Sequence, residues 1–299
     1  MADEILGKVS NHWSKVKHAG RSRWWTNPAI LCHINRLVCG VPLAGPWAGL
    51  ERLMCALVSG ETFRRGISVG CGNGFKELQL IRNGVVEHFD LFELSQFRVS
   101  QGQALAANQG IANRVSFHSG NAFDTPLNDN YDLVYWNNAL HHMLDVESAI
   151  RWSRERLIYG GYFVMDDFVG ASRFQWSSYQ IELASQVRTI LPERFLRHPE
   201  NPSITLSRHV ARPTVESMIA LDPSEAADSD NILPALKRVF PRASVTLTGG
   251  VIYHLALNDV LANFDDLDDD PLLQSLLLLD ETVARAGETQ YAVAIASKE

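Results

Sequence analysis

The chain has 299 residues, of which 46% are hydrophobic and 20% are charged, and its formal net charge at pH 7 is −7. This composition is ordinary for a soluble globular protein with one large α/β domain or two small domains. The acidic balance and the absence of any Lys/Arg-rich block argue against a protein that binds nucleic acid.

Targeting signals and metal-binding patterns are also missing from the sequence. The first residues, MADEILGKVSNHW, lack the pattern of a secretory signal, and no apolar run is long enough to cross a membrane. The four cysteines form no CxxC pair, which favours free thiols in a reducing compartment over a metal site. We therefore expect a cytoplasmic protein that has neither membrane contact nor bound metal.

The first 60 residues carry helical patterns and no strand alternation. In the segment 27–40, Ile30, Ile34, Leu37 and Val38 recur at helical spacing, and a glycine ends the pattern. The segment 47–60 repeats this arrangement. We expect residues 1–60 to form a helical cover over the rest of the chain.

Residues 61–170 alternate between strand and helix signals. The expected strands are 66–70, 88–95, 114–120, 131–136 and 162–168, and the expected helices between them are 75–84, 96–110 and 146–161. Strands joined through helices pair in parallel by right-handed crossovers. This pattern predicts a doubly wound α/β core.

The alternation stops at residue 171 and resumes near residue 241. Helical signals at 176–195 and 215–240 flank a polar, proline-containing loop at 197–214, so we interpret 171–240 as a helical lid insertion. Strands at 243–250 and 289–297, with helices at 251–264 and 271–287, then complete the core over 241–299. The prediction is a mostly parallel sheet of seven strands.

Three glycines mark the end of the first core strand. Gly70, Gly72 and Gly74 follow the GxGxG spacing, unlike the GxGxxG of dinucleotide sites, and no lysine stands directly after the last glycine as it does in a P-loop. The next strand ends in Glu93, whose carboxylate can accept both hydrogens of a ribose diol. Turn and acid together indicate a nucleoside site at the carboxyl edge of the sheet.

Five segments in order, ISVGCGNG, LFELS, VSFHSGNAFD, YDLVYWNNALHHMLD and RERLIYGGYFVMDDF, resemble the class I S-adenosylmethionine-dependent methyltransferases over residues 66–169. The resemblance implies that family's doubly wound fold and S-adenosylmethionine as cofactor. It implies a set of cofactor-binding residues, which are Gly70, Cys71, Gly72, Gly74, Glu93, Leu94, Asn121, Ala122, Phe123, Asn137 and Asn138. Asn121 stands where the family usually has an acid, and its carbonyl can accept the adenine bond without charge assistance.

The histidine pair in NALHHMLD offers a candidate base. An imidazole titrates near neutrality, so His141 could take the proton of a hydroxyl acceptor; the alternative is a histidine that packs or caps a helix start. Asp166 and Asp167 are adjacent on a strand and point to opposite faces, so at most one faces the pocket. The candidate substrate contacts are Trp25, His33, His142, Asp167, Arg173 and Trp176.

These observations favour an enzyme that methylates a small molecule, most readily at an oxygen. A nucleotide-dependent oxidoreductase or epimerase is the alternative from another enzyme class, but the GxGxG spacing and the lack of a Tyr-xxx-Lys pair oppose it. A non-catalytic protein that keeps the cofactor pocket is a third hypothesis, which the asparagine at position 121 leaves open.

Overall fold

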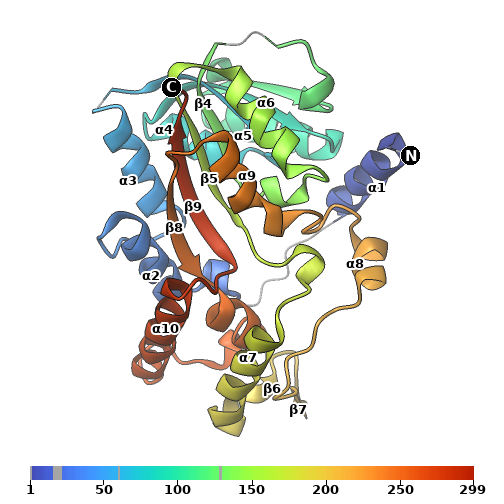
Figure 1. Cartoon of the computed structure of the whole chain (residues 1–299), viewed down its shortest axis with the longest axis vertical. Coiled ribbons are helices and arrows are strands. Elements are labelled where there is room, and N and C mark those ends of the chain that lie inside the picture. Colours follow the sequence, from blue (N-terminus) through green and yellow to red (C-terminus); the bar gives the residue numbers. More distant parts are fainter. Residues whose placement is uncertain (1, 16–21, 60, 128–129) are drawn as a thin grey trace.

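The centre of the fold is a seven-stranded sheet with the strand order β3-β2-β1-β4-β5-β9-β8 (Figure 1). The computed structural model describes residues 2–15, 22–59, 61–127 and 130–299. The strands are β1 (Phe63–Val69), β2 (Val86–Glu93), β3 (Val115–Ser119), β4 (Tyr131–Asn137), β5 (Leu157–Phe168), β8 (Ser244–Gly249) and β9 (Tyr291–Ser297). The first five pair in parallel, and β9 runs antiparallel to both β5 and β8. The predicted doubly wound, mostly parallel sheet of seven strands is confirmed.

Helices cover both faces of this sheet because its central strands are apolar on both sides. On one face lie α2 (Pro28–Cys39), α3 (Ala48–Leu57), α4 (Phe75–Arg82) and α5 (Gln96–Asn108), whose apolar residues share a core with Phe89 and Tyr135. On the other face, α6 (Val146–Arg156) and α9 (Ile232–Val239) pack around Val134 and Trp136. The strand order reverses between β1 and β4, and the crevice at such a point is where doubly wound folds bind ligands.

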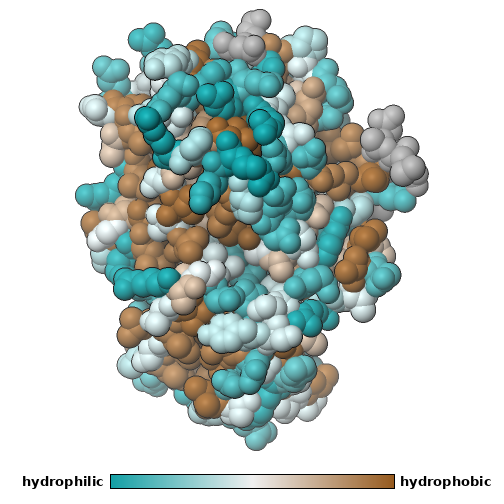
Figure 2. Space-filling model, in the orientation of Figure 1, coloured by the Kyte–Doolittle hydropathy of each residue, from teal (hydrophilic) through white to brown (hydrophobic). Residues whose placement is uncertain are grey.

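The segment after β5 forms a second apolar cluster at one end of the molecule. It contains α7 (Ser178–Ile190), the short hairpin of β6 (Arg197–His198) and β7 (Asn201–Thr205), and α8 (Val215–Leu221). α7 packs with α10 (Asp270–Arg285) and with a π-helical turn at Val251–Ala256. Figure 2 shows apolar residues at the lower end of the molecule, where α7 and α10 lie in Figure 1.

The structure divides the segment 171–240 differently from the sequence interpretation. Its last helix, α9, packs on α6 and belongs to the core of the sheet, with Ile232 and Leu236 fully or almost fully buried. The inserted part of the structure therefore ends before α9. The loop expected at 197–214 contains the β6–β7 hairpin.

Two element boundaries also differ from expectation. β5 begins at Leu157, inside the segment expected to be helical up to residue 161, because it pairs with β4 from Tyr131 onward. The segment 251–264 forms the π-helical turn and a short 3₁₀ turn (Leu261–Asn263) in place of an α-helix. Within the described ranges, every helix is too short or too polar to cross a membrane.

Candidate functional site

The glycine turn after β1 has the backbone conformation that the sequence suggested. Gly70, Gly72 and Gly74 have φ angles of +68°, +60° and +70°. Such angles strain residues with a Cβ, and a Cβ on Gly74 would lie 2.8 Å from Cδ1 of Leu91. The turn therefore needs these glycines, and it places backbone N–H groups at the start of α4.

Glu93 ties this turn to the end of β2. Its Oε2 accepts a hydrogen bond from the Gly72 N–H at 2.9 Å, and its Oε1 accepts one from the Ser95 N–H at 2.8 Å. Burial raises the pKa of Glu93, although these two backbone donors oppose the shift. Each carboxylate oxygen keeps a free lone pair, so the group can still accept two hydrogens from a diol.

Helix α1 (Ala2–Lys15) lies over the segment that follows Glu93. Ser10 Oγ donates to the Leu94 carbonyl at 3.1 Å, and the Ser14 and Ser95 hydroxyls are 2.7 Å apart. Arg98 Nε donates to the carbonyl of Trp13 at 2.8 Å. These contacts fix α1 beside Glu93, the acid predicted to bind the ribose, whereas the sequence predicted only a general helical cover for residues 1–60.

Asn121 uses its side chain locally. Its Oδ1 accepts from the Phe123 N–H at 3.2 Å, and its Nδ2 donates to Asp124 at 2.7 Å, so the amide caps a short 3₁₀ turn (Ala122–Asp124). Ala122 is buried in the core, and the Phe123 ring packs edge-on against Trp152 at 5.0 Å. The turn lies at the end of β3, as an adenine-binding role requires.

His141 and Asp167 form a buried hydrogen-bonded pair. His141 Nδ1 is 2.5 Å from Asp167 Oδ1, while Asp167 Oδ2 accepts the N–H groups of Ala139 and Leu140 at 2.9 and 2.8 Å. Burial alone would lower the pKa of His141, but the Asp167 carboxylate outweighs it and the pKa is raised. Burial would raise the pKa of Asp167, yet His141 and the backbone donors hold it below the usual value.

The insertion brings further charges to the outer side of this pair. Glu225 Oε1 lies 3.6 Å from His141 Nε2, and His142 Nδ1 lies 3.0 Å from Ser224 Oγ. The ligand atoms of His141, His142 and Glu225 are all within 4.8 Å of one another. Because Asp167 and Glu225 flank the two ring nitrogens of one imidazole, we interpret this group as a proton site rather than a metal centre.

A cavity of about 60 Å³ opens at the carboxyl edge, between α2 and α3 and the ends of the strands. Its polar lining includes Asn138 and Asp166, and its aromatic lining consists of Trp24, Trp25, Trp47, Tyr253 and Tyr291. Within the described chain, no hydrogen bond reaches the Asp166 carboxylate. Burial and the neighbouring Asp167 charge raise the pKa of Asp166 to about 7.

Lys76, in the first turn of α4, reaches the end of β4. Its Nζ donates to the carbonyl oxygen of Asn137 at 2.5 Å and to its Oδ1 at 2.8 Å. The ammonium also lies 5.4 Å from the ring centroid of Trp47, which lines the cavity. Burial lowers the pKa of Lys76, and the charges of Glu77, Asp167 and Asp166 oppose this.

Several predicted substrate contacts lie elsewhere. Asp167 is fully buried and holds His141 instead of facing substrate. Arg173 donates to the carbonyls of Glu225 and Pro223, so its guanidinium is used to fix the insertion. His33 contacts Arg36, beside the ion pair between Arg36 and Glu281 of α10, and does not line the cavity.

Two more predicted residues have different environments. Trp176 is only 8% exposed and stacks on Phe174 in the apolar cluster, with ring centroids 5.4 Å apart. Trp25 does line the cavity, as expected. Cys71 Sγ faces the backbone of the glycine turn, and burial raises the pKa of its thiol.

Lys76 and Glu225 were not predicted from the sequence. Lysine is a common residue in helices, so nothing local distinguishes Lys76, and its contact with Asn137 is seen only in the structure. Glu225 lies far from the core motifs, and only the folding of the insertion brings it to His141.

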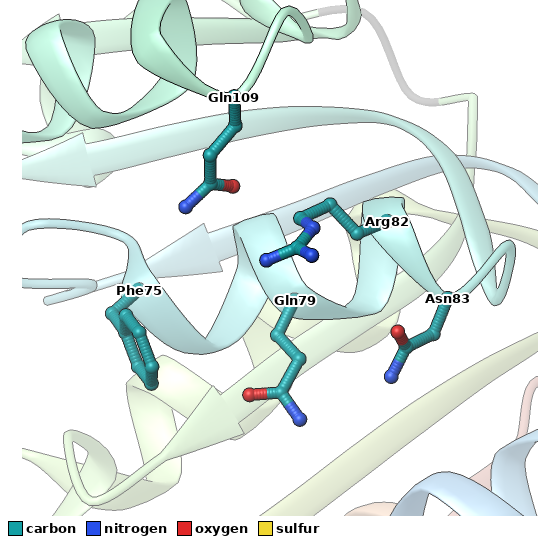
Figure 3. Close-up of a pocket in the computed structure, with 5 residues that line it drawn as sticks. All are labelled: Phe75, Gln79, Arg82, Asn83 and Gln109. Atoms are coloured by element: carbon teal, nitrogen blue, oxygen red, sulfur yellow. The ribbon is translucent and has the colours of Figure 1, made fainter.

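A second hollow, about 230 Å³ in volume, lies along the outer side of α4 (Figure 3). Phe75, Gln79, Arg82 and Asn83 line it from α4 and the residue that follows, and Gln109 lines it from the end of α5. Amide groups and one guanidinium offer neither a nucleophile nor a base. The carboxyl edge of the sheet therefore remains the candidate site.

The comparisons with known proteins match the part of the chain that contains β1 to β5. Residues 65–198 match a family model described as a methyltransferase domain. Ajmaline N-methyltransferase of Rauvolfia serpentina is 35% identical over 89 residues, which make up 29% of this chain and 30% of that protein. The probable chloroplastic tocopherol O-methyltransferase of Oryza sativa subsp. japonica is 35% identical over 80 residues, 26% of this chain and 22% of that protein. The matched parts thus cover less than a third of either relative.

Solved structures resemble the chain over nearly its whole length. Geranyl diphosphate C-methyltransferase from Streptomyces coelicolor A3(2), in complex with Mg²⁺, geranyl diphosphate and S-adenosylhomocysteine, superposes with a TM-score of 0.55 at 13% identity. The match covers 99% of this chain and 98% of that one. At this identity the likeness shows the fold, which is the one predicted from the five segments.

Proposed function

We propose that the protein transfers a methyl group from S-adenosylmethionine to an oxygen of a small molecule, a proposal supported by the match of residues 65–198 to a methyltransferase-domain model and by the fold. The observation that carries the proposal is the Gly72–Glu93 hydrogen bond, which fixes a diol-accepting carboxylate against the glycine turn. The matched relatives carry N- and O-methyltransferase names and the solved structure a C-methyltransferase title, so the choice of oxygen rests on this chain's own residues.

The residues at the carboxyl edge fit the proposed cofactor. Glu93 would accept the ribose hydroxyls, the glycine turn would lie along the ribose and the chain beyond it, and Ala122 and Phe123 would border the adenine. Gly70 could not be replaced freely, because a Cβ there would lie 3.1 Å from Cβ of Ala139. When bound, the cofactor supplies a methyl group on a positively charged sulfur, which is electrophilic. The remaining tasks of orientation, water exclusion and proton removal fall to the protein.

The buried His141–Asp167 pair supports oxygen as the acceptor atom. A hydroxyl needs a base to remove its proton, whereas a carboxylate acceptor does not. Asp167 holds His141 Nδ1, so Nε2 is the nitrogen available to take a proton. Asp167 raises the pKa of His141, which strengthens the imidazole as a base, and Glu225 Oε1 lies 3.6 Å from the Nε2 atom that would take the proton.

Calorimetry and a transfer assay test the proposal. S-adenosylhomocysteine should bind with a micromolar or lower Kd while NAD shows no heat of binding, and radiolabelled methyl should pass from S-adenosylmethionine to a hydroxyl compound in a metabolite screen. Binding of NAD in place of S-adenosylhomocysteine would contradict the methyltransferase proposal.

Replacing His141 tests the proton step separately. The His141→Ala variant should lose about 10²–10⁴-fold in turnover, the usual contribution of a general base. Its Kd for S-adenosylhomocysteine should stay within about twofold, since Nδ1 and Nε2 face Asp167 and Glu225 rather than Glu93. The exposed His209→Ala is the matched control. Unchanged turnover in the His141 variant would show that His141 is not the base, and it would not contradict the proposed methyl transfer.

A further inference from the structure

The cavity with aromatic walls at the carboxyl edge lies beside the part of the rim that is predicted to bind the cofactor. Three of its lining residues belong to strands on one side of the sheet, which are Asp166 of β5, Thr248 of β8 and Tyr291 of β9. The glycine turn follows β1 and Glu93 ends β2, and the strand order places β4 between these two strands and β5. A molecule in this cavity would therefore be a neighbour of the cofactor and would not take its place.

One carboxylate sets the charge of this cavity. Within the described part of the chain, the Asp166 carboxylate accepts no hydrogen bond. The neighbouring Asp167 carboxylate is bonded to His141, and the Lys76 ammonium donates to oxygens of Asn137. Among the described residues that line the cavity there is no arginine, lysine or histidine. An ionised Asp166 therefore lacks a cation, and the cavity would repel an anionic ligand.

Four aromatic rings form a connected wall of the same cavity. The Trp24 ring lies in the middle, with its centroid 4.7 Å from that of Tyr291 and 5.2 Å from that of Tyr253. Trp25 meets the Trp24 ring edge-on, with centroids 5.8 Å apart. The Tyr291 hydroxyl is 3.1 Å from Nδ1 of His254, which fixes the tyrosine ring. The wall is thus formed before any ligand binds.

Two cations of the chain itself lie against rings of this cavity. The Arg23 guanidinium is 6.0 Å from the centroid of Trp25, and the Lys76 ammonium is 5.4 Å from that of Trp47. The negative face of an aromatic ring attracts a cation, and the attraction is stronger where water is excluded. Aromatic walls and a carboxylate without a partner are together the surroundings that suit an organic ammonium ion.

We propose that this cavity holds a protonated amine of the methyl acceptor, with the ammonium group on the Asp166 carboxylate and against the tryptophan and tyrosine rings. This inference rests on the proposed function, because it names the class of small molecule that the enzyme methylates, a hydroxyl compound that also carries an amine. A protonated amine has no free lone pair, so it cannot take the methyl group. It anchors the molecule, and the hydroxyl group is the acceptor.

The size of the cavity agrees with this assignment. Its volume of about 60 Å³ corresponds to roughly two water molecules at about 30 Å³ each. An ammonium group with a short carbon stem fills such a space. The rest of the acceptor would extend toward Asn138, which lines the cavity at the end of β4, next to the predicted cofactor site.

Three small probes of similar size test the preference for a cation. Ethylammonium, ethanol and acetate are each added at pH 8, where most of the Asp166 carboxyl is ionised because its pKa is about 7. Binding is followed through the tryptophan indole N–H signals in an NMR titration. Ethylammonium should bind with a Kd of about 1–10 mM, which is within the limit for so small a ligand. Ethanol and acetate should bind about 10-fold more weakly or not at all.

Two variants assign this preference to the cavity. Asp166→Asn keeps the shape of the side chain, and it should lower the affinity for ethylammonium about 10-fold and remove its advantage over ethanol. Trp25→Leu removes a partly exposed ring and should lower the affinity about 2–5-fold. The exposed Asp266→Asn and Tyr159→Leu are the matched controls and should bind ethylammonium as the wild type does. Equal binding of the three probes, no binding of ethylammonium, or a preference that survives Asp166→Asn would overturn the inference.

The methyl-transfer assay separates this inference from the proposed function. Hydroxyl compounds that become methylated in the screen should carry an amine, and Asp166→Asn should raise their KM about 10-fold while the Kd of S-adenosylhomocysteine stays within about twofold. Acceptors without an amine would contradict the inference and leave methyl transfer intact. If S-adenosylhomocysteine does not bind the wild type, the proposed function fails, whereas the ethylammonium titration still reports on the cavity because it needs no cofactor.

Discussion

The Glu93 carboxylate both holds the glycine turn and can accept hydrogens from a ligand. Its hydrogen bonds show how one side chain can do both. Its two oxygens hold the N–H groups of Gly72 and Ser95, which fixes the position of the glycine turn relative to α5. The same oxygens keep lone pairs directed away from the backbone, where a diol could bind. A smaller residue would lose the ligand contact and loosen the turn at the same time.

The Glu93→Ala variant should therefore bind S-adenosylhomocysteine more weakly by about 1–3 kcal/mol, the contribution of a hydrogen bond to a charged group. Isothermal titration calorimetry measures this change. Glu87→Ala, at the exposed start of the same strand, is the control and should bind as the wild type does. Equal affinity in the Glu93 variant would place the ribose elsewhere.

The proton on His141 gives the activity a pH dependence whose sign is fixed. A base acts only when deprotonated, so activity should rise with pH through the pKa of His141, which Asp167 raises above 6.5. Asp167→Asn removes the charge that raises this pKa. The acid limb of the kcat/KM profile should then move to lower pH while the maximal rate falls, because Asn holds the ring less firmly. If the acid limb of the profile does not move, a group other than His141 produces it.

At the scale of elements, α1 is the part of the molecule whose position depends most on a few polar contacts. It reaches the nucleoside side of the site through Ser10, Ser14 and the carbonyl of Trp13. In Figure 1 it lies at the edge of the molecule, near the N-terminal label. Helices held in this way open locally at low cost.

Binding of S-adenosylhomocysteine should slow the amide hydrogen exchange of α1, because a ligand at Glu93 fixes Leu94 and Ser95, on which the helix docks. Hydrogen-exchange mass spectrometry of the free and bound protein measures this effect. The exposed β6–β7 hairpin at the other end of the molecule should not change. If the ligand does not change the exchange rate in α1, the helix does not border the binding site.

The elements that the sequence predicted well are those whose signals are local. Strand β1, the glycine turn and α4 follow from an apolar run, three glycines and a helical period, and α2 follows from its helical period and from Gly40, which ends it in the left-handed conformation. The start of β5 was missed because Leu157–Gly161 carries no strong local signal and is a strand only through its pairing with β4. The turn at Val251–Ala256 was missed because a distant carboxylate, that of Asp280, accepts the N–H groups of Gly250 and Ile252.

In the candidate site, too, local signals were predictable and long-range contacts were not. The positions of Glu93 and His141 at the carboxyl edge could be predicted because the chain order of strands fixes which ends meet, while their roles in binding and catalysis stay predictions. The roles of Asp167 and Arg173 could not, because a carboxylate or guanidinium near a pocket can serve either the substrate or the protein's own backbone. Their hydrogen bonds show that both side chains bind backbone groups of the protein itself.

At the scale of the whole molecule, three apolar clusters meet at one rim. Two of them cover the faces of the sheet, and the third joins α7, α10 and the π-helical turn below its carboxyl edge. The site therefore lies where the layers end, and its charged groups, Lys76, Asp166 and Asp167 among them, are more enclosed than surface charges. Enclosed charges lower the stability of the free fold, which is the usual cost of a preformed site.

Because of Asp166, the stability of the folded chain should depend on pH. Its carboxyl has a pKa of about 7 in the folded chain against 3.8 as a free side chain. A carboxyl whose pKa rises on folding stabilises the fold in its protonated form, and this contribution is lost as pH rises from 3.8 to about 7, above which the difference is constant. Asp166→Asn keeps the shape and removes the charge, so its Tm should match the wild type near pH 4 and exceed it by a few degrees at pH 8.

A control variant makes this measurement specific to the site. The exposed Asp266→Asn should shift Tm equally at both pH values, since no buried charge is removed. If the Tm of Asp166→Asn differs from that of the wild type by the same amount at pH 4 and at pH 8, Asp166 is only a packing residue.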